Sequence, residues 1–448
     1  MKNIRIAPIM LAIVSFFSLQ SCWNLARISP PCPTITDRKP DGAHFGETVT
    51  IIGSGFLKGC PELYTVSING QAIPKENILE VPNEQSLTFK VPKGASSGQI
   101  KVVPTGSTDC TSGNGLDFTY YYTSTMVSLL VGTFTTTPSC PTAATANFLN
   151  NPAGLDMDSS GNVLVADKFN NVVRVIKLSA SDPMAGTIVG THGKVNANCV
   201  SGCNASPVPL SSGASFGSPS DVDVDLSGNL FVLEETNSIM RLIRTSSSVE
   251  IYAGSCQVSM LINGPRLTTA RLSFPQCISK DGDDIYFTDA GNIRKIDAAG
   301  NVSTIVPRPT VNSSYRGIEI SRARPREGPI FVTDEIAKNI KFFTASLVQG
   351  TVAVRNSSVL SLNKPIALTL DSKGSIFIAD EAAQRIFVIY PNGELDILAG
   401  NGTKGSANGV PGRSAQFNAP LGIALNEAQK VIYVSDSQNH VIRSIKIE

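Results

Sequence analysis

Net charge of either sign is the first thing that this sequence lacks. Its 37 Lys and Arg balance 36 Asp and Glu to a formal charge of +1, so no broad basic surface exists to attract nucleic acid. It has only three His, too few for a site that needs several imidazole ligands. Charged residues make up 16% of the chain, whereas 37 Gly and 27 Pro accompany 42% apolar residues. This composition argues against a coiled coil or a disordered chain and is typical of a β-rich protein with many turns.

Long apolar runs are also missing beyond the first twenty residues, and a membrane span needs about 18 residues or more. Within that first segment, Lys2 and Arg5 precede an apolar stretch from Ile6 to Leu19. This order is typical of a secretory signal peptide, which we place at residues 1–21 and exclude from the fold.

The end of this segment reads Leu19-Gln20-Ser21-Cys22. It resembles a bacterial lipobox, in which the signal peptide is cut before a cysteine that receives lipid. The resemblance implies lipidation of Cys22 and a lipid-anchored protein of the bacterial cell envelope, on the outer membrane or cell surface or on the periplasmic leaflet, with residues 22–32 as a linker. The membrane is then contacted through this anchor only. An ordinary signal peptide that is cut near a cysteine is the alternative.

The cysteine count also fits an exported chain. Nine Cys less Cys22 leaves eight, and an even remainder suggests disulfides whose connectivity the sequence leaves open. Cys60 and Cys110 fall beyond strand ends and could pair. Zinc is the alternative, but the Cys199-x3-Cys203 spacing is weak evidence by itself. The eight are Cys32, Cys60, Cys110, Cys140, Cys199, Cys203, Cys256 and Cys277.

The C-terminal two-thirds of the chain contain six related segments. Each has a short apolar strand, a D-x-x-G type turn, a second strand that ends in an acid, a polar turn and a third strand. The segments begin at Pro152, Pro219, Pro275, Arg316, Pro365 and Pro420. Their terminal acids, the repeat acids, are Asp167, Glu234, Asp289, Asp334, Asp380 and Asp436.

A base stands seven residues after the repeat acid in four copies, as Arg174, Arg241, Lys341 and Arg443, while the fifth copy has Phe387 and the third is shorter. An Asp that closes a strand before a polar turn commonly accepts backbone N–H groups, and the base returns beside it across the hairpin. We therefore interpret the repeat acids as structural and not as a catalytic site.

Apolar runs near residues 187, 249, 302, 351 and 395 read as a fourth strand after five of the six copies. The sixth copy ends with the chain, and the stretch Met126 to Gly132 before the first copy has the same character. If this stretch completes the last sheet, the repeats close into a ring with only short, protected edges. The pattern predicts a six-bladed β-propeller closed by an N-terminal strand.

These segments resemble NHL repeats, with the pattern P-x-G-[IL]…D-x-x-G-x-[IL]-[YF]-V-[AST]-D-x-x-N-x-x-[IV]-[RK]. The sixth copy matches best, and the fourth departs most because "RARPREG" replaces its Asp-Gly turn. The resemblance covers residues 126–448 and implies the propeller fold for them.

Residues 33–122 have a different pattern, with short alternating strands between Gly and Pro turns, which suits a β-sandwich. The order G-x-x-V-T-I-x-G-x-G-F, V-x-I-N-G and V-P-x-G-x-x-x-G-x-I-x-V resembles an IPT/TIG domain, an immunoglobulin-like module. Gly53 and Gly55 are expected at a bulge or tight bend and Phe56 in the core. The whole chain is thus expected to be all-β.

Four connections between a fourth strand and the next first strand are long: about 132–151, 190–218, 254–274 and 400–419. In a propeller they emerge on the same face as the turns that follow the repeat acids, and long loops of this kind are commonly functional. We expect this face to bind a protein or glycan partner, with no cofactor, no catalysis and a monomeric chain. The candidate contact residues are His192, Arg266, Arg271, Lys404 and Arg413.

An enzyme is the alternative, because six-bladed relatives include calcium-dependent lactonases and zinc-dependent lyases, whose sites need several acids or His near the channel. Candidate channel acids are Asp156, Asp158, Asp223, Asp225, Glu319 and Asp371, which follow no common pattern. No G-x-S-x-G elbow or phosphate-binding loop occurs. His192 and His440 are expected to be solvated polar residues. A structural part of an envelope complex is a third interpretation.

Overall fold

A computed structural model describes residues 32–93, 95, 97–105, 115–132, 149–178, 185–189, 208–209, 216–245, 248–309, 312–321, 323–324, 328–355 and 360–448. The chain divides into two compact units, one up to Thr123 together with Glu448 and one from Ser124 to Ile447. Each unit has its own core. No helix in the described part of the chain is long and apolar enough to cross a membrane.

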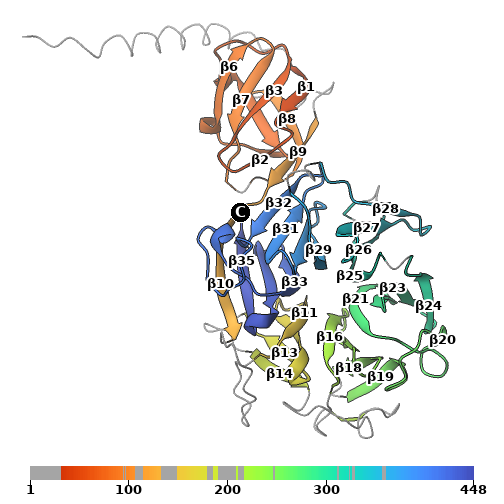
Figure 1. The fold of residues 1–448 in the computed structure, drawn as a ribbon. Helices are drawn as coiled ribbons and strands as arrows, with labels where there is room; N and C mark the ends of the chain where they lie inside the picture. Colours follow the sequence, from red (N-terminus) through yellow and green to blue (C-terminus); the bar gives the residue numbers. More distant parts are fainter. Residues whose placement is uncertain are drawn as a thin grey trace, which may run out of the picture. The chain divides into compact units, whose positions relative to one another are not determined.

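The first unit is a β-sandwich of two sheets (Figure 1). One sheet has the order β1-β3-β7-β6, with β1 (Thr34–Lys39), β3 (Thr48–Ser54), β7 (Ser86–Lys90) and β6 (Ile78–Asn83). The other has the order β2-β9-β8-β4-β5, with β2 (Gly42–His44), β9 (Leu116–Tyr121), β8 (Gly98–Pro104), β4 (Tyr64–Ile68) and β5 (Gln71–Ala72). Two 3-10 turns are η1 (Pro61–Leu63) and η2 (Lys75–Asn77).

The glycine-rich end of β3 lies where the sequence predicts a bend. A Cβ on Gly53 would lie 2.0 Å from the Thr34 carbonyl oxygen, and β1 bulges opposite it between Ile35 and Asp37. Gly55 has a φ of +86°, which favours glycine. Phe56 is 1% exposed and packs edge-on against Tyr64, as expected for a core residue.

The second unit is a six-bladed propeller in which the first strand of each blade lies innermost (Figure 1). Blade 1 has β11 (Pro152–Met157), β12 (Val163–Asp167), β13 (Val172–Ile176) and β14 (Ala185–Val189); blade 2 has β16 (Pro219–Val224), β17 (Leu230–Glu234), β18 (Ile239–Arg244) and β19 (Ser248–Gly254), extended by β15 (Val208–Pro209). Blade 3 has β21 (Pro275–Asp281), β22 (Asp284–Asp289), β23 (Asn292–Ile296) and β24 (Asn301–Val306), extended by β20 (Gly264–Pro265).

The other three blades follow the same order. Blade 4 has β25 (Tyr315–Ile320), β26 (Ile330–Asp334), β27 (Asn339–Phe343) and β28 (Gln349–Thr351). Blade 5 has β29 (Pro365–Leu370), β30 (Ile376–Asp380), β31 (Arg385–Ile389) and β32 (Leu395–Ala399); blade 6 has β33 (Pro420–Asn426), β34 (Val431–Asp436), β35 (Val441–Ile447) and β10 (Ser124–Gly132). Short 3-10 turns are η3 (Lys168–Asn170), η5 (Gly412–Ser414) and η6 (Ser437–Asn439). Strand β28 is shorter than the apolar run at 351–354 predicts.

The strand ahead of the repeats closes the ring, which confirms the predicted fold. β10 pairs antiparallel with β35, with Val127 opposite Ile445 and Ser128 opposite Ser444. Val127 is fully buried. Without β10, the outer edge of β35 would expose a row of unpaired backbone groups.

The core of the propeller lies between neighbouring blades. Side chains of β12, such as Val163 and Val165, pack with Tyr433 and Ile442 of blade 6 in one apolar cluster. The other face of β12 contributes Leu164 to a cluster with blade 2. Each hairpin therefore buries both faces, and no blade is expected to be stable alone.

A disulfide across the closing pair should stabilise the propeller. Ser128 and Ser444 have their hydroxyl oxygens 3.0 Å apart, so the double variant Ser128→Cys/Ser444→Cys should oxidise readily. Linking the two ends of the ring should raise the free energy of unfolding by about 2 to 4 kcal/mol. Urea unfolding of the oxidised and reduced double variant measures this difference. A thiol pair that stays reduced under mild oxidation would contradict the closure.

Candidate functional site

Each repeat acid fixes the end of the connection that leads into its own blade. The carboxylates accept backbone N–H groups from residues one or two positions before the first strand, as Asp167 does from Asn150 at 2.7 Å. The other donors are Gly217 to Glu234, Ser273 to Asp289, Ser314 to Asp334, Asn363 and Lys364 to Asp380, and Asn418 to Asp436. All six acids are fully buried. Each carboxylate thus holds the backbone at the start of its blade, which is a structural role.

Arginines of the third strands hold the long loops. In blade 3, Arg294 donates to Asp289 at 2.9 Å, to the carbonyl oxygens of Ile262 and Arg271, and to Asn263. Blade 6 repeats this arrangement with Arg443, which donates to Asp436, Asn408 and the carbonyl oxygens of Ala407 and Gln416. One buried guanidinium thus ties a loop to the repeat acid.

The presence of this arginine follows the length of the loop that leads into the blade. Buried Arg174 and Arg241 pair with the repeat acids of blades 1 and 2, which long connections also precede. Blades 4 and 5 have shorter connections and carry Lys341 and Phe387 at this position. Lys341 Nζ instead donates to Thr351 Oγ1 at an exposed site.

Replacing Arg294 or Arg443 with Met should lower the free energy of unfolding of the propeller by about 3 to 5 kcal/mol, because a buried carboxylate loses its cation and the loop loses its donors. The matched change Lys341→Met should cost about 1 kcal/mol or less, since its partner is exposed. Urea unfolding monitored by circular dichroism compares them. If Arg294→Met lowers the free energy of unfolding no more than Lys341→Met does, the buried arginine does not hold the loop as described.

We call the face that carries the long loops and the turns after the repeat acids the loop face. Of its predicted contact residues, Arg266 stacks on Tyr252 with its guanidinium carbon 4.1 Å from the ring centre and donates to the Tyr252 carbonyl oxygen. Arg271 donates to three carbonyl oxygens of its own loop. Arg413 pairs with Asp396 at 2.5 Å. Lys404 is exposed, and His192 lies outside the described residues.

The loop between β19 and β21 exposes apolar side chains that charge-based reasoning missed. It is folded as a hairpin, with the Met260 N–H donating to Leu272 and Ile262 bridged to Arg271. Five of its apolar side chains are between 37% and 53% exposed: Val258, Met260, Leu261, Leu267 and Phe274. The sequence signal for them is the run of apolar residues in a segment that supplies no strand to the blade core.

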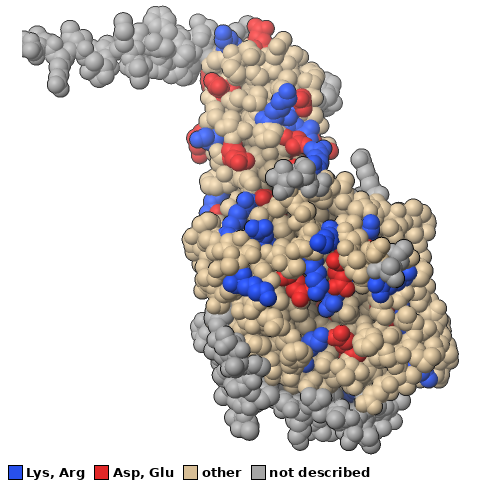
Figure 2. All heavy atoms as spheres, viewed as in Figure 1, with Lys and Arg blue, Asp and Glu red and all other residues tan. Residues whose placement is uncertain are grey.

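Around the middle of the propeller, acids and bases lie in pairs. Figure 2 shows charged side chains of both signs gathered there, with a mostly uncharged surface around them. Lys168 and Glu235, which follow two repeat acids directly, pair at 2.5 Å between blades 1 and 2. Two further pairs are Arg316 with Glu335 and Lys364 with Glu381.

The channel brings together acids from three first strands. Asp156, Asp223 and Glu319 occupy equivalent positions on β11, β16 and β25 and line a hollow of 580 Å³ that opens away from the loop face, together with Lys280. The other candidates, Asp158, Asp225 and Asp371, accept N–H groups inside their own turns. The predicted set therefore divides into channel acids and turn acids.

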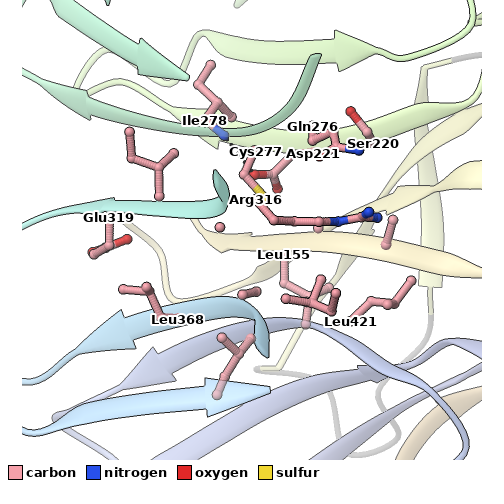
Figure 3. A pocket seen from close by; sticks show the side chains of 18 of the residues that line it. Leu155, Ser220, Asp221, Gln276, Cys277, Ile278, Arg316, Glu319, Leu368 and Leu421 are labelled. Carbon is pink, nitrogen blue, oxygen red and sulfur yellow. Dashed lines mark hydrogen bonds between the residues drawn. The ribbon is translucent and has the colours of Figure 1, made fainter. Parts of the chain in front are cut away.

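Two channel residues escaped the sequence analysis. Asp221 and Cys277 stand at the third position of their first strands, where the other blades have Gly154, Gly317, Ala367 and Gly422. They line a smaller cavity of 80 Å³ that Glu319 also borders (Figure 3). A Cβ on Gly154 would lie 1.7 Å from Asp221 Oδ1, so the small residue makes room for the carboxyl. Their departure from P-x-G was a readable signal.

Hydrogen bonds tie these acids to the neighbouring blades. Asp221 of blade 2 accepts the Ile278 N–H of blade 3, as well as that of its own neighbour Val222, and Asp156 of blade 1 accepts the Val224 N–H of blade 2. The Cys277 thiol is hydrogen-bonded to Asp221. Cys277 is a free cysteine, so the even remainder of eight does not form four disulfides as the count suggested. Disulfides among the other cysteines stay a prediction.

Burial dominates the electrostatics of the channel. It raises the pKa of Asp221 and Glu319 to about 8 and that of Asp156 to about 6, with repulsion among the acids as a further cause. Burial also raises the pKa of Asp223 and of the Cys277 thiol. Asp221 and Glu319 therefore hold protons near neutral pH, and the thiol is a poor nucleophile. Within the described ranges, no three His, Cys, Asp or Glu side chains are grouped so as to hold a metal ion.

The raised pKa of Glu319 predicts a stability that falls as pH rises. The folded carboxyl holds its proton up to about pH 8, whereas the unfolded one loses it near its ordinary value. As the pH rises between these two values, ionisation favours the unfolded state, so the free energy of unfolding falls. Glu319→Gln should equal the wild type near pH 5 and exceed its free energy of unfolding by about 1 to 3 kcal/mol above pH 8. Urea unfolding at several pH values tests this; parallel profiles would contradict it.

The prediction that His440 is solvated is wrong. It is 8% exposed, lies in the left-handed region with a φ of +59° and accepts the Asn151 N–H at Nδ1, 3.0 Å away. Burial lowers its pKa, which keeps that nitrogen available as an acceptor. Asn171 and Gln384 occupy the same position and accept N–H groups of the next blade. His440 is thus a junction residue between the last and first blades.

Known proteins share both parts of this architecture. Residues 33–120 match the IPT/TIG domain. An 85-residue stretch is 35% identical to NHL repeat-containing protein 2 of Bos taurus, covering 19% of this chain and 11% of that protein, so the chain spans about a tenth of the curated relatives' length.

Solved structures show the same fold over almost the whole chain. A Bacteroides thetaiotaomicron protein of unknown function has a TM-score of 0.54 at 14% identity, over 93% of this chain and 98% of that one. An auxiliary nutrient binding protein from Bacteroides ovatus has a TM-score of 0.52 at 17% identity, over 94% and 99%. The chain therefore combines an immunoglobulin-like IPT/TIG domain with a six-bladed propeller. The propeller is built of NHL-type repeats.

Proposed function

We propose that this chain is a binding protein whose loop face docks a protein partner without catalysis. The observation that carries the proposal is the hairpin loop between β19 and β21, which a buried arginine holds in place and which exposes five apolar side chains. Apolar side chains grouped on a protein surface commonly mark an interaction site. We further propose that the protein is exported and anchored through Cys22 at the bacterial cell envelope.

Several features favour a protein over a glycan as the partner. Four of the five exposed side chains are aliphatic, including Met260 and Leu267, and these fill apolar pockets of a protein surface. A pre-folded loop also loses little conformational entropy on binding. The similarly folded Bacteroides ovatus protein is described as a nutrient binding protein, and a binding role is what we extend to this chain.

A calcium-dependent hydrolase is the second candidate, because Asp156, Asp223 and Glu319 line one hollow of the channel. Propellers serve both binding and catalysis, so the fold does not decide between them. The contacts favour binding, since Asp156 accepts the Val224 N–H of blade 2 and Asp221 accepts the Ile278 N–H of blade 3. Those carboxyls join blades, which is a structural role.

Site-specific photo-crosslinking in the cells that make the protein tests the docking face. A photoreactive amino acid at Leu267 or Phe274 should give a discrete protein adduct, because both side chains are about half exposed on the loop face. Leu226 is the matched control, since it is fully exposed and lies in a turn on the opposite face. The adduct should be lost when Met260 and Leu261 are changed to Ser.

Adducts that form equally from Leu226, or none from the loop face, would contradict the proposal. Turnover of a lactone or ester that needs calcium and stops on chelation would replace it with the hydrolase. Mass spectrometry of the mature N-terminus in the same cells shows whether the chain begins at a lipidated Cys22.

A further inference from the structure

A groove lies between blades 4 and 5, the two blades without the buried arginine that binds a long loop. At other blade junctions the long loops insert buried apolar side chains, such as Leu272 before blade 3 and Phe417 before blade 6, both with no exposed surface. Beside the shorter connection that precedes blade 5, of which residues 352–355 and 360–364 are described, lies a hollow of 350 Å³ between blades 4 and 5. The hollow thus lies between the two blades that carry Lys341 and Phe387 in place of the buried arginine.

The walls of this hollow are aliphatic. They include Ile340 of β27, Val352 and Val354 after β28, Leu360 and Leu362 before β29, and Ile389 of β31. None of the described residues that line it is aromatic. Aliphatic walls suit a branched or unbranched apolar side chain, whereas sugars are commonly held against aromatic faces.

A second hollow continues the first across the loop face. It has a volume of 580 Å³ and shares Lys338 and Leu362 with the aliphatic part. Its further walls come from the turn after β30 and from the loop after β32, including Gly402. The two hollows together form what we call the blade 4/5 groove.

Among the described residues that line the two hollows, the charged ones are the basic residues Lys338 and Arg385. Lys338 Nζ donates to Asn363 Oδ1 at 3.1 Å, and Arg385 Nη2 donates to the Asn401 carbonyl oxygen at 3.0 Å. Both partners are neutral, so neither contact compensates the charge. Arg385 Nε is buried and has no hydrogen-bond partner among the described residues.

We propose that the blade 4/5 groove binds an extended acidic peptide segment of the partner, an inference that rests on the proposed function and names its chemistry. One aliphatic side chain of the segment fills the hollow beside Ile340 and Val352. A carboxylate of the segment accepts hydrogen bonds from Arg385 and pairs with Lys338, since carboxylates are the ligands that match a guanidinium. The groove and the apolar loop then lie on one docking face.

Panning the full chain against a phage-displayed library of short random linear peptides tests the groove. Enriched peptides should combine Asp or Glu with a nearby Leu, Ile or Met. Their dissociation constants should rise at least about tenfold in Lys338→Glu/Arg385→Glu, because attraction becomes repulsion. Ala353→Trp, at an exposed wall position, should block binding by filling the hollow.

Lys373→Glu is the matched control, because Lys373 is exposed on blade 5 in the turn between β29 and β30, on the opposite face; it should leave affinity unchanged. Unfolding curves of all variants should overlay that of the wild type. No enrichment, enriched peptides without acids, or equal affinity for the charge-reversed variant would overturn the groove proposal.

The two proposals fail in different ways. Crosslinks from Leu267 and Phe274 without peptide enrichment would leave the docking face and remove the acidic peptide. Peptides that bind the groove without such crosslinks would leave a binding protein and remove the β19–β21 loop as the contact.

Discussion

The buried carboxylate at the end of each second strand is the interaction on which the rest of the propeller depends. A carboxylate without exposed surface is costly unless hydrogen bonds and a cation compensate it. Here the backbone N–H of the residue leading into the blade supplies the first compensation, as Asn150 does for Asp167. In four blades an arginine supplies the second. The acid therefore sets where each first strand begins, and through this the shape of the loop face.

The arginine stabilises the long loops by donating hydrogen bonds to their carbonyl oxygens. A guanidinium has five N–H donors in a fixed plane, so one face can bind the repeat acid while the rest reaches loop carbonyls. Arg294 and Arg443 do this with equivalent partners, Asn263 and Asn408. A lysine has a compact ammonium group on a flexible stem and lacks the planar fork of donors, and Lys341 Nζ donates to Thr351 Oγ1 instead. The residue at this position thus differs between blades that follow a long loop and blades that follow a shorter one. Long loops place buried apolar side chains at the junctions before blades 3 and 6, whereas a hollow lies between blades 4 and 5.

The fold was predictable from the sequence because its signals are repeated. Period-two strands and six acids in register indicate blades, and one unmatched apolar segment before them indicates closure, which the β10–β35 pairing confirms. The site was less predictable, because it depends on what neighbouring blades place beside each residue. His440 reads as a polar turn residue, yet its backbone conformation directs Nδ1 to the next blade. Arg294 was missed because its blade has a shorter turn, which shifts the spacing from the repeat acid.

The acids of the channel also serve to join neighbouring blades. Asp156 and Asp221 spend their hydrogen-bonding capacity on strands of adjacent blades, and the small Gly154 leaves the space that Asp221 occupies. Burial raises the pKa of both carboxyls, to about 8 for Asp221 and to about 6 for Asp156, so Asp221 is a neutral polar link between blades near neutral pH. The blade 4/5 groove on the loop face differs from the channel, because its charged side chains are basic and lie beside an aliphatic hollow. Arg385 donates to the neutral carbonyl oxygen of Asn401 and lies next to the aliphatic part of the blade 4/5 groove. A charged side chain with a neutral partner, next to an aliphatic hollow, is a combination that an acidic and apolar partner segment can complete.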